Sequence, residues 1–377
     1  MLDKVYVRPC MEINLNRVLE NYLAFSRAKS NPDTNMAAVV KDNAYGLGDQ
    51  EIAKILYEQG GCRTFFVAHG FEGSRVRAVA PNADIYVLQG PGQEDLECFR
   101  KDNLIPVIAS LSQLNFWFQQ MPNNQKPALQ IETGLNRLGL RPQEIASLDQ
   151  ETRDKFGVVL SHLACADEPG HSQNEFQLKN FQELKSNFPK AKFSLAASDG
   201  FLLGPDYQFD IVRLGAVLYG LNPVPNPKVI SKNVLQIKAP VIQVADVKPG
   251  DCVGYGADYV VKEKGKIAIV SIGYADGVFR SFFPKGKVWF KDQDGWLAAP
   301  LAGRVSMDNL ICDVSHIPDD VLYKNQYVSL INDSYTADDF GRDAGTIGYE
   351  VISVFGHGIR FIKEYVSEDD LKQKDSD

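Results

Sequence analysis

Met36-Ala-Ala-Val-Val-Lys-Asp-Asn-Ala-Tyr-Gly46 joins an apolar run directly to a turn that contains glycine. The apolar part has the composition of a buried strand. In a parallel α/β fold, reactive side chains lie where such strands end and turns begin. Lys41 stands at that position, where a partly desolvated amine can form a Schiff base with an aldehyde. Position alone also allows a solvated lysine in a strand-to-helix loop.

The same strand-and-turn unit repeats along the first part of the chain. Eight apolar runs alternate with segments of helical periodicity, among them 50–58, 93–101 and 173–184. The runs are Ala37–Lys41, Phe65–Ala68, Asp84–Gln89, Pro106–Ala109, Ala128–Glu132, Gly157–His162, Phe193–Ala197 and Asp210–Leu214. Eight units in about two hundred residues predict a (β/α)8 TIM barrel. A doubly wound open sheet is the alternative, but it usually carries a GxGxxG turn near its start, which is missing here.

The character of the sequence changes after Gly220. A proline-rich connector, 221–228, disfavours both helix and central strand. Short β-rich runs follow between glycine-containing turns: Val241–Val247, Lys266–Ile272, Lys287–Lys291 and Gln326–Ile331. We expect a barrel domain over residues 10–232 and a mostly β domain over residues 233–366. A short strand within residues 1–9, around Tyr6-Val7-Arg8, could pair with the second domain. The charged tail, 367–377, is expected to be disordered.

Composition excludes several kinds of partner and site. A net charge of −8 gives no support for a nucleic-acid-binding surface. No apolar run approaches the length needed to span a membrane, and the N-terminus lacks the apolar core of a signal peptide. None of the six cysteines forms a CxxC pair or has a histidine at zinc-finger spacing. We therefore expect a cytoplasmic protein with reduced, mostly buried cysteines and no metal site.

Polar residues fall at or just after five of the predicted strands. They are Lys41, Arg137, His162, Ser198 and Arg213, which follow or end the first, fifth, sixth, seventh and eighth runs. The C-terminal ends of barrel strands meet at one mouth, where TIM barrels place their active sites. A salt bridge, a helix cap or a core histidine would explain any one of these residues. Their convergence predicts a catalytic site.

Eight motifs, in fixed order and spacing, carry a family resemblance. They are Val40-Lys-Asp-Asn-Ala-Tyr-Gly-Leu-Gly48, Glu132-Thr-Gly-Leu-Asn-Arg-Leu-Gly139, Ser161-His-Leu-Ala-Cys-Ala-Asp-Glu168, Arg213-Leu-Gly-Ala-Val-Leu-Tyr-Gly220, Val253-Gly-Tyr-Gly-Ala-Asp-Tyr259, Gly273-Tyr-Ala-Asp-Gly277, Gly303-Arg-Val-Ser-Met-Asp308 and Thr346-Ile-Gly-Tyr-Glu350. From Pro9 to Ile362 the chain resembles the alanine racemases, fold-type III enzymes that use pyridoxal 5′-phosphate (PLP). The resemblance implies an amino-acid racemase that interconverts L- and D-alanine and supplies D-alanine for peptidoglycan in the cell wall.

The resemblance also implies two acid/base residues, one on each face of the cofactor. Lys41 would bind the cofactor aldehyde and serve as one of them. Tyr255 would be the other and would come from the partner subunit of a homodimer. Because tyrosine normally titrates near pH 10, it needs help to act near neutrality. The family places His162 and Arg213 in the surrounding polar network, with Arg213 facing the pyridine nitrogen and keeping it unprotonated by charge repulsion.

Further positions follow from the same resemblance. The cofactor phosphate would be bound by Ser198, the backbone amides of Gly215 and Ala216, and the hydroxyls of Tyr45 and Tyr349. The carboxylate of a small amino-acid substrate would meet Arg137 and the backbone near Met307, and Met307 and Asp308 would belong to the partner subunit. Tyr274 and Arg304 would line the corridor through which substrate arrives.

Four positions depart from the family pattern. Gln130 replaces a lysine that is often carbamylated and whose negative charge steadies the carboxylate-binding Arg137. We hypothesise that a neighbouring acid or a bound anion such as chloride supplies that charge here. Asp42, Leu47 and Ala197 replace a usual alanine, histidine and asparagine. We expect Asp42 to face away from the pocket, and the departures put rate and substrate preference in doubt more than reaction class.

The sequence also allows other functions. A racemase of the same fold could act on serine or on a broader set of amino acids. A fold-type III decarboxylase is a different class of enzyme, although the motifs at 253–256 and 303–308 resemble the racemases instead. A non-catalytic PLP-binding protein of the single-barrel type would not need the second domain or Tyr255.

Overall fold

The computed structural model describes residues 7–121, 126–225 and 227–366 and divides into two compact units. One unit is Val18–Lys232, and the other joins the N-terminal segment through Arg17 to the chain from Asn233 onward. Residues 10–17 therefore group with the second unit and not with the barrel. The tail expected to be disordered, 367–377, lies outside the described residues.

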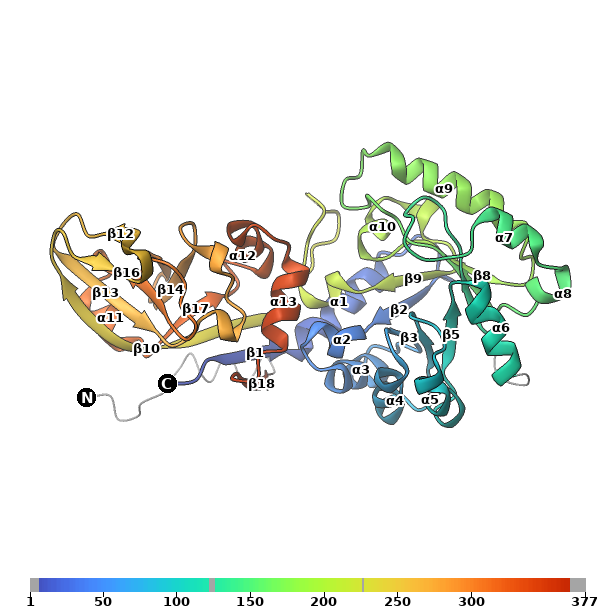
Figure 1. Ribbon diagram of the computed structural model, residues 1–377, viewed down its shortest axis with the longest axis horizontal. Coiled ribbons are helices and arrows are strands. Elements are labelled where there is room, and N and C mark those ends of the chain that lie inside the picture. Colours follow the sequence, from blue (N-terminus) through green and yellow to red (C-terminus); the bar gives the residue numbers. More distant parts are fainter. Residues whose placement is uncertain (1–6, 122–125, 226, 367–377) are drawn as a thin grey trace. The chain divides into compact units, whose positions relative to one another are not determined.

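The first unit is an eight-stranded parallel barrel, which confirms the TIM barrel predicted from the sequence (Figure 1). Its strands are β2 (Asn35–Val39), β3 (Thr64–Val67), β4 (Asp84–Val87), β5 (Ile105–Ile108), β6 (Ala128–Gln130), β7 (Val158–Leu160), β8 (Lys192–Ser194) and β9 (Ile211–Leu214). Neighbours along the chain pair in parallel from β2 to β8, and β9 pairs with β2. A bridge between Ala197 and Arg213 and a hydrogen bond from Asp210 N–H to Phe193 O (3.0 Å) bring β8 and β9 together.

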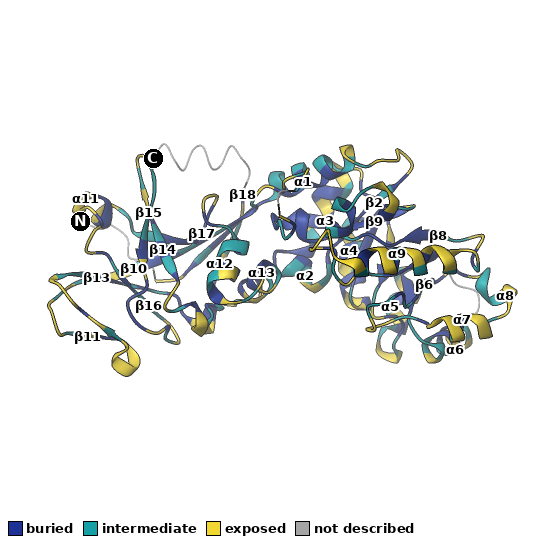
Figure 2. Ribbon diagram, turned by 90° about the horizontal axis from the view of Figure 1, so that it is seen from above, coloured by how far each residue is buried: buried dark blue, intermediate teal, exposed yellow. Residues whose placement is uncertain are grey.

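Alternating apolar residues fill the barrel interior. Ala37 and Val39 of β2 share one buried cluster with Phe66, Val107 and side chains from four further strands. Two-residue spacing puts Ala37 and Val39 on the same face, as a strand requires. Figure 2 shows the barrel strands in the colour of buried residues, whereas helix α9 (Ser172–Lys185) carries many exposed ones.

Helices alternate with the strands, as the periodicity indicated. They are α1 (Leu15–Arg27), α2 (Lys41–Tyr45), α3 (Asp49–Glu58), α4 (Gly70–Val79), α5 (Leu96–Lys101), α6 (Leu111–Gln120), α7 (Pro142–Ser147), α8 (Gln150–Arg153), α9 and α10 (Ser198–Leu202). A 3-10 helix, η3 (Ala216–Tyr219), follows the last barrel strand.

The second unit is mostly antiparallel β structure, also as predicted (Figure 1). One sheet has the order β15-β14-β17-β10-β1-β18, with β13 added to β10 and β16 added to β13, and β11 pairs with β12 separately. The strands are β1 (Cys10–Asn14), β10 (Leu235–Val247), β11 (Cys252–Val253), β12 (Tyr259–Val260), β13 (Gly265–Val270), β14 (Lys287–Asp292), β15 (Gly295–Pro300), β16 (Leu310–Asp313), β17 (Tyr327–Ile331) and β18 (Ile362–Val366).

The N-terminal strand lies later in the chain than expected. Tyr6 is outside the described residues, and Val7–Pro9 are not in a strand. The strand begins at Cys10, directly after Pro9, whose missing N–H suits a position before the first residue of a ladder. It pairs antiparallel with β10 and parallel with β18.

Three helices interrupt the β-rich unit: α11 (Asp319–Lys324), α12 (Ala337–Ala344) and α13 (Gly348–Gly356). The sequence reading missed them, although Thr336 and Asp339 form the capping box that starts α12. The aromatic rings of Phe282 and Phe340, 4.0 Å apart, help to pack this region.

Within the described residues no helix has the length and apolar character to cross a bilayer. All six cysteines are free thiols, but only Cys62 and Cys312 are buried, three are half-buried and Cys252 is exposed. The expectation of mostly buried cysteines was therefore wrong.

Candidate active site

Lys41 stands at the mouth of the barrel, two residues beyond the end of β2. The end of the strand is fixed from both sides, because Tyr219 Oη donates to Val39 O at 2.7 Å and Val40 N–H donates to Phe66 O at 2.9 Å. Lys41 itself is half-buried. Its placement matches the position predicted for a reactive amine.

Burial and nearby charge lower the pKa of Lys41. Burial is the largest cause, and the guanidinium of Arg137 is the next. The carboxylates of Glu72 and Asp42 act in the opposite direction, and Arg213 adds to the lowering. An amine in this environment loses its proton more readily than a solvated lysine and can accept one again.

The turn after Lys41 is left-handed. Asp42, Asn43, Ala44 and Tyr45 have φ of 57°, 53°, 53° and 58°, and Gly46 follows at 83°. Hydrogen bonds from Ala44 N–H to Val40 O (2.9 Å) and from Gly46 N–H to Asp42 O (2.7 Å) close the turn. Each residue with a Cβ in this conformation costs roughly 1–2 kcal/mol, so other contacts must hold the turn in place. Asp42 is exposed, in line with the expectation that it faces away from the pocket.

Arg213 is buried in the barrel, and its acceptors among the described residues are neutral. Nη1 bonds Ser194 O (3.0 Å) and Ser194 Oγ (2.6 Å), and Nη2 bonds Ser161 O (2.7 Å) and Leu195 O (3.3 Å). Burial lowers the pKa of Arg213 to about 10, so the guanidinium keeps its charge at neutral pH. The site therefore contains a fixed, uncompensated positive charge.

His162 lies beside Arg213, with 3.5 Å between His162 Nδ1 and Arg213 Nη2. Burial, followed by the charges of Arg213, Arg137 and Lys41, lowers the pKa of His162 to about 3. The imidazole is therefore neutral across the physiological pH range. The structure brings Lys41, His162, Arg213 and Arg137 together, as the sequence predicted.

Neutral hydrogen-bond donors lie close together at a second part of the barrel mouth. Ser198, at the start of α10, is buried, and its Oγ accepts the N–H of Gly215 at 2.9 Å. A Cβ added at Gly215 would lie 2.7 Å from Tyr45 Oη, so glycine makes room for the tyrosine hydroxyl. Ala216 begins η3, and the first N–H groups of a helix have no partner within it. Tyr45, Ser198, Gly215 and Ala216 thus form one cradle.

Hydrogen bonds hold the loop that carries Arg137 against the end of β6. The Glu132 carboxylate accepts the N–H groups of Gly134 and, at 3.3 Å, Arg137. Gln130 Nε2 donates to Leu138 O at 3.1 Å and does not bond the Arg137 guanidinium. Our hypothesis that a neighbouring acid or a bound anion supplies charge to Arg137 stays a prediction.

The other two departures from the family pattern have structural roles. Leu47 is fully buried, as an apolar side chain in the turn should be. Ala197 forms the bridge with Arg213 at the junction of β8 and β9. A larger residue there would have to fit against the end of the barrel sheet.

The remaining candidate residues lie in the β-rich unit, mostly around the segment 303–308. Gly303 packs against the turn that carries Tyr255: a Cβ at Gly303 would lie 2.7 Å from Val253 O. Arg304 forms an ion pair with Asp258 and covers Gly256, where a Cβ would lie 2.9 Å from Arg304 Cζ. Tyr255 projects outward and is 73% exposed.

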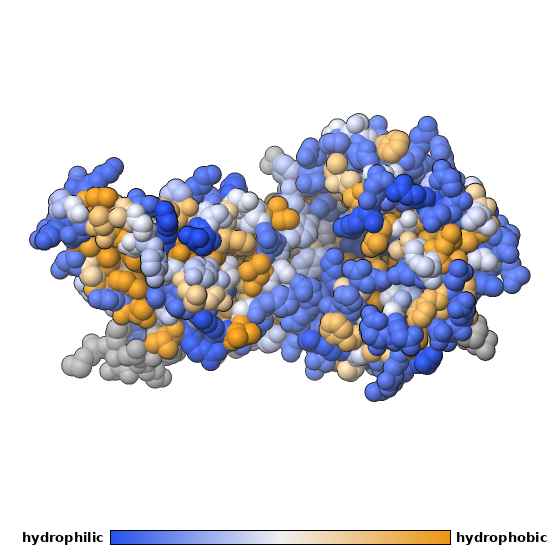
Figure 3. All heavy atoms as spheres, in the orientation of Figure 1, coloured by the Kyte–Doolittle hydropathy of each residue, from blue (hydrophilic) through white to orange (hydrophobic). Residues whose placement is uncertain are grey.

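On the other side of the same segment, a 3-10 turn, η5 (Tyr274–Asp276), holds the backbone of Met307. Ala275 N–H donates to Met307 O, and Tyr274 N–H donates to Ser306 O, both at 3.0 Å. Asp308 forms an ion pair with Arg360 at 2.6 Å. Tyr274 and Met307 are exposed, and Figure 3 shows further apolar residues on the surface of this unit.

Tyr349 is the one phosphate-binding candidate outside the barrel unit. It stands in the first turn of α13 and is half-buried. The two units are described separately, so its part in the cradle stays a prediction.

Two charged residues near Lys41 escaped the sequence reading. Glu72 and Arg75, on α4, contact the left-handed turn through Asp42 N–H and Asn43 Oδ1. The signal in the sequence was a glutamate in the first turn of a helix after β3, which reads as an ordinary cap. Nothing in the pattern of apolar residues indicated the contact between Arg75 and Asn43.

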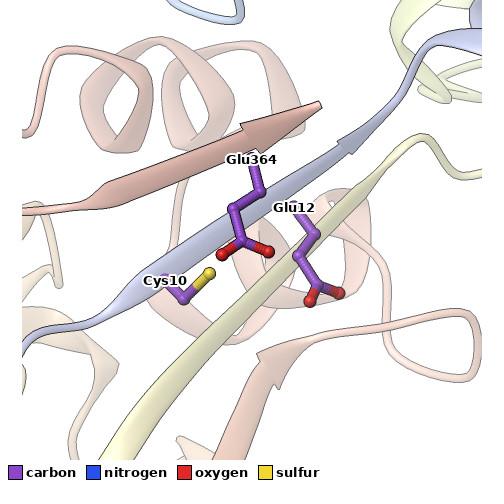
Figure 4. Close-up of side chains that lie close together, drawn as sticks. All are labelled: Cys10, Glu12 and Glu364. Carbon is purple, nitrogen blue, oxygen red and sulfur yellow. The ribbon is translucent and has the colours of Figure 1, made fainter. Parts of the chain in front are cut away.

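One group of side chains has the composition of a metal site. Ligand atoms of Cys10, Glu12 and Glu364 lie within 4.8 Å of one another, on strands β1 and β18 (Figure 4). Glu12 and Glu364 are opposite each other in the parallel ladder. Lys238 Nζ, 2.8 Å from Glu12 Oε2, supplies a positive charge to the group. We interpret it as a charge cluster of the sheet.

The residues at the barrel mouth suit pyridoxal 5′-phosphate. A half-buried amine with a lowered pKa is present for the aldehyde. The cradle at Gly215, which a Cβ would fill, offers hydroxyl and backbone donors for a phosphate. A guanidinium held by neutral acceptors offers a fixed charge for the ring nitrogen.

Comparisons with known proteins agree with this chemistry. The chain matches the family profiles described as alanine racemase, N-terminal domain, over residues 13–223 and alanine racemase, C-terminal domain, over residues 234–363. The biosynthetic alanine racemase of Agrobacterium fabrum is 38% identical, and the match covers 96% of this chain and 94% of that protein. The alanine racemase of a Ruegeria species is 39% identical, with 94% and 98% covered.

Solved structures show the same similarity. Alanine racemase from Bartonella henselae, with covalently bound pyridoxal phosphate, has a TM-score of 0.87 and 33% identity, covering 96% of this chain and 100% of that one. Biosynthetic alanine racemase from Pseudomonas aeruginosa has a TM-score of 0.85 and 29% identity, with the same coverage. The chain belongs to the alanine racemase family.

Proposed function

We propose that this chain is a PLP-dependent alanine racemase that interconverts L- and D-alanine. The observation that carries the proposal is the single barrel mouth shared by the Lys41 amine, the neutral His162, the charged Arg213 and the cradle at Gly215. Family membership, from profiles that span most of the chain, supports the same reaction.

Lys41 has two tasks in this proposal. It holds the cofactor covalently, and it exchanges a proton with the α-carbon of the amino acid from one face. PLP, when bound to the substrate amine, withdraws electrons from the α-carbon and makes its proton more acidic. The lowered pKa of Lys41 suits this exchange near neutral pH, because a base works best when its pKa is close to the ambient pH.

Tyr255 exchanges a proton from the opposite face and comes from the partner subunit of a homodimer. Its side chain is 73% exposed in the single chain, so its hydroxyl is accessible to a neighbouring subunit. Arg304, packed on Gly256, keeps the Tyr255 turn in place. Inversion of a stereocentre requires proton exchange on opposite faces, and two groups on opposite sides of the cofactor would satisfy that requirement directly.

Arg213 and His162 set the charge of the site. The fixed charge of Arg213 disfavours protonation of a neighbouring pyridine nitrogen, which limits side reactions such as transamination. His162 stays neutral at physiological pH. It can therefore form hydrogen bonds without adding a charge that changes with pH.

Substrate carboxylate binds between Arg137 and the backbone N–H of Met307 from the partner. The Ser306 carbonyl, which shares a peptide with the Met307 N–H, accepts the Tyr274 N–H at 3.0 Å, and this bond orients that peptide. Tyr274 and Arg304 line the approach. Ser198, Gly215, Ala216 and Tyr45 hold the phosphate, together with Tyr349. The product D-alanine serves peptidoglycan, and the free thiols agree with a cytoplasmic enzyme.

The test is a direct measurement of racemisation and of α-proton exchange with alanine, serine and lysine. We expect alanine to be the best substrate, Lys41→Ala to lose bound cofactor and both activities, and Tyr255→Phe to lose racemisation. Bound cofactor without any exchange would identify a PLP-binding protein and overturn the proposal. If serine or lysine were turned over faster than alanine, that amino acid would be the preferred substrate in place of alanine.

A further inference from the structure

Helix α4 presents two charged side chains to the turn that follows Lys41. Glu72 and Arg75 are three residues apart and so lie on the same face of the helix. Glu72 is 5% exposed, whereas Arg75 is half-exposed. Neither belongs to the set of residues that would touch substrate or cofactor.

The two carboxylate oxygens of Glu72 serve two different segments. Oε2 accepts the N–H groups of Ala68 (2.7 Å) and His69 (3.1 Å), which caps the start of α4. Oε1 accepts the N–H of Asp42 at 2.6 Å. A helix cap requires only the first set of bonds. The bond to Asp42, the first left-handed residue after Lys41, must therefore serve the turn.

Arg75 holds the far side of the same turn. Its Nη2 lies 2.8 Å from Asn43 Oδ1 and 2.7 Å from Asp49 Oδ1. Asn43 Oδ1 also accepts the N–H of Asp49 at 3.1 Å. Asp49 is fully buried at the start of α3, where burial raises its pKa and the guanidinium favours its charged form. The contacts of α4 thus reach both ends of the segment 42–49.

This support matches a physical need. Four consecutive residues with Cβ atoms are left-handed, a conformation that isolated chain avoids. Strained backbone persists at a site only where surrounding contacts hold it. Because Lys41 directly precedes the strained residues, a relaxed turn would move the amine.

We propose that Glu72, supported by Arg75, is a positioning residue that holds the left-handed turn and thereby fixes the place of the Lys41 amine. The importance of that placement for catalysis rests on the proposed function. The charge of Glu72 has a second effect. The groups that act on Lys41 are the cations Arg137 and Arg213, the anions Glu72 and Asp42, and the neutral His162. Glu72 is the buried anion among them, so it favours the protonated amine.

Glu72→Gln separates the two roles of the carboxylate. The amide oxygen can still cap α4, but its nitrogen cannot accept the Asp42 N–H. The matched control is Glu144→Gln, because Glu144 accepts Arg141 N–H at 2.9 Å and caps α7 of the same unit. Glu72→Asp keeps the negative charge but has a side chain shorter by one methylene. Arg75→Met changes a half-exposed position and can be measured in place of Glu72→Gln if that variant does not fold.

Two measurements on the full chain with cofactor removed test the proposal. Amide hydrogen exchange in residues 42–47 should be at least about tenfold faster in Glu72→Gln, Glu72→Asp and Arg75→Met than in the parent or Glu144→Gln. The pH of half-maximal labelling of Lys41 by an amine-reactive reagent should fall in Glu72→Gln and stay near the parent value in Glu72→Asp.

Loaded enzyme provides the third measurement. We expect kcat/KM for alanine to drop at least about tenfold in Glu72→Gln, with partial recovery in Glu72→Asp. The positioning role would be overturned if Glu72→Gln matched Glu144→Gln both in the amide hydrogen exchange of residues 42–47 and in the pH dependence of Lys41 labelling. Absence of racemisation in the parent protein would overturn the proposed function, while exchange and labelling would still decide the role of Glu72.

Discussion

At the scale of single residues, the site is defined by basic groups that share one end of the barrel. Lys41 and His162 have lowered pKa values, and Arg213 stays charged although it is buried. These shifts have a common cause, because burial and mutual repulsion both disfavour added positive charge. The arrangement combines two permanent cations, Arg137 and Arg213, with two groups that give up protons easily, Lys41 and His162.

His162 makes the stability of the protein depend on pH. Its pKa is near 6.5 in an unfolded chain and about 3 in the folded one, so between these values the unfolded state binds more protons. Stability is therefore lost as pH falls below 6.5, by up to about 1.4 kcal/mol for each pH unit. His162→Gln should remove this contribution. Urea midpoints measured from pH 5 to 7 should fall less steeply for the variant, and parallel curves would contradict the assignment.

Arg213→Met should destabilise the fold by about 2–4 kcal/mol, measured by urea unfolding. The change removes the guanidinium donor from the buried carbonyls of Ser161, Ser194 and Leu195, of which Ser194 O keeps its bond from Ser161 N–H. Arg342→Met is the control, because Arg342 pairs with Asp339 on the surface and surface pairs contribute little. Equal effects of the two substitutions would show that the Arg213 network does not hold the barrel end.

At the scale of elements, the sequence predicted all eight barrel strands because apolar runs and turns recur with a clear spacing. Boundaries differed by one to a few residues, as in β2, which ends at Val39 and not at Lys41. The left-handed turn could not be predicted, since Asp42, Ala44 and Tyr45 seldom adopt positive φ. It depends on Glu72 and on other contacts that are distant in sequence, which no local pattern reveals.

Gly215→Ala tests the cradle at the end of β9. The added methyl would lie 2.7 Å from Tyr45 Oη and would displace the hydroxyl. Overpacking of this kind costs about 1–3 kcal/mol, which corresponds to roughly five- to 150-fold weaker PLP binding.

Gly170→Ala is the matched control for the cradle, because a Cβ at Gly170 has nothing within 4 Å. Cofactor affinity, measured by absorbance titration, should be unchanged in that variant. Unchanged affinity in Gly215→Ala as well would place the phosphate elsewhere.

At the scale of the whole molecule, composition and motif order predicted a barrel followed by a mostly β unit. The helices α11, α12 and α13 were missed because short amphipathic segments between strands resemble loops. The sequence also predicted that the polar residues after the barrel strands share one mouth, because parallel strands all end on the same side. The proposed pairing of Lys41 with Tyr255 is different, because it would depend on subunit assembly and not on the fold of one chain.

The measurement that tests this account most directly is complementation between two inactive variants, Lys41→Ala and Tyr255→Phe. In a dimer with shared sites, a hybrid holds one site with both Lys41 and Tyr255 intact and one site with neither. Random pairing of equal amounts should restore about a quarter of the parent racemisation activity, from half the dimers and one of two sites in each. If each site were built from one chain, no site in a hybrid could contain both residues, and a mixture as inactive as its components would contradict the account.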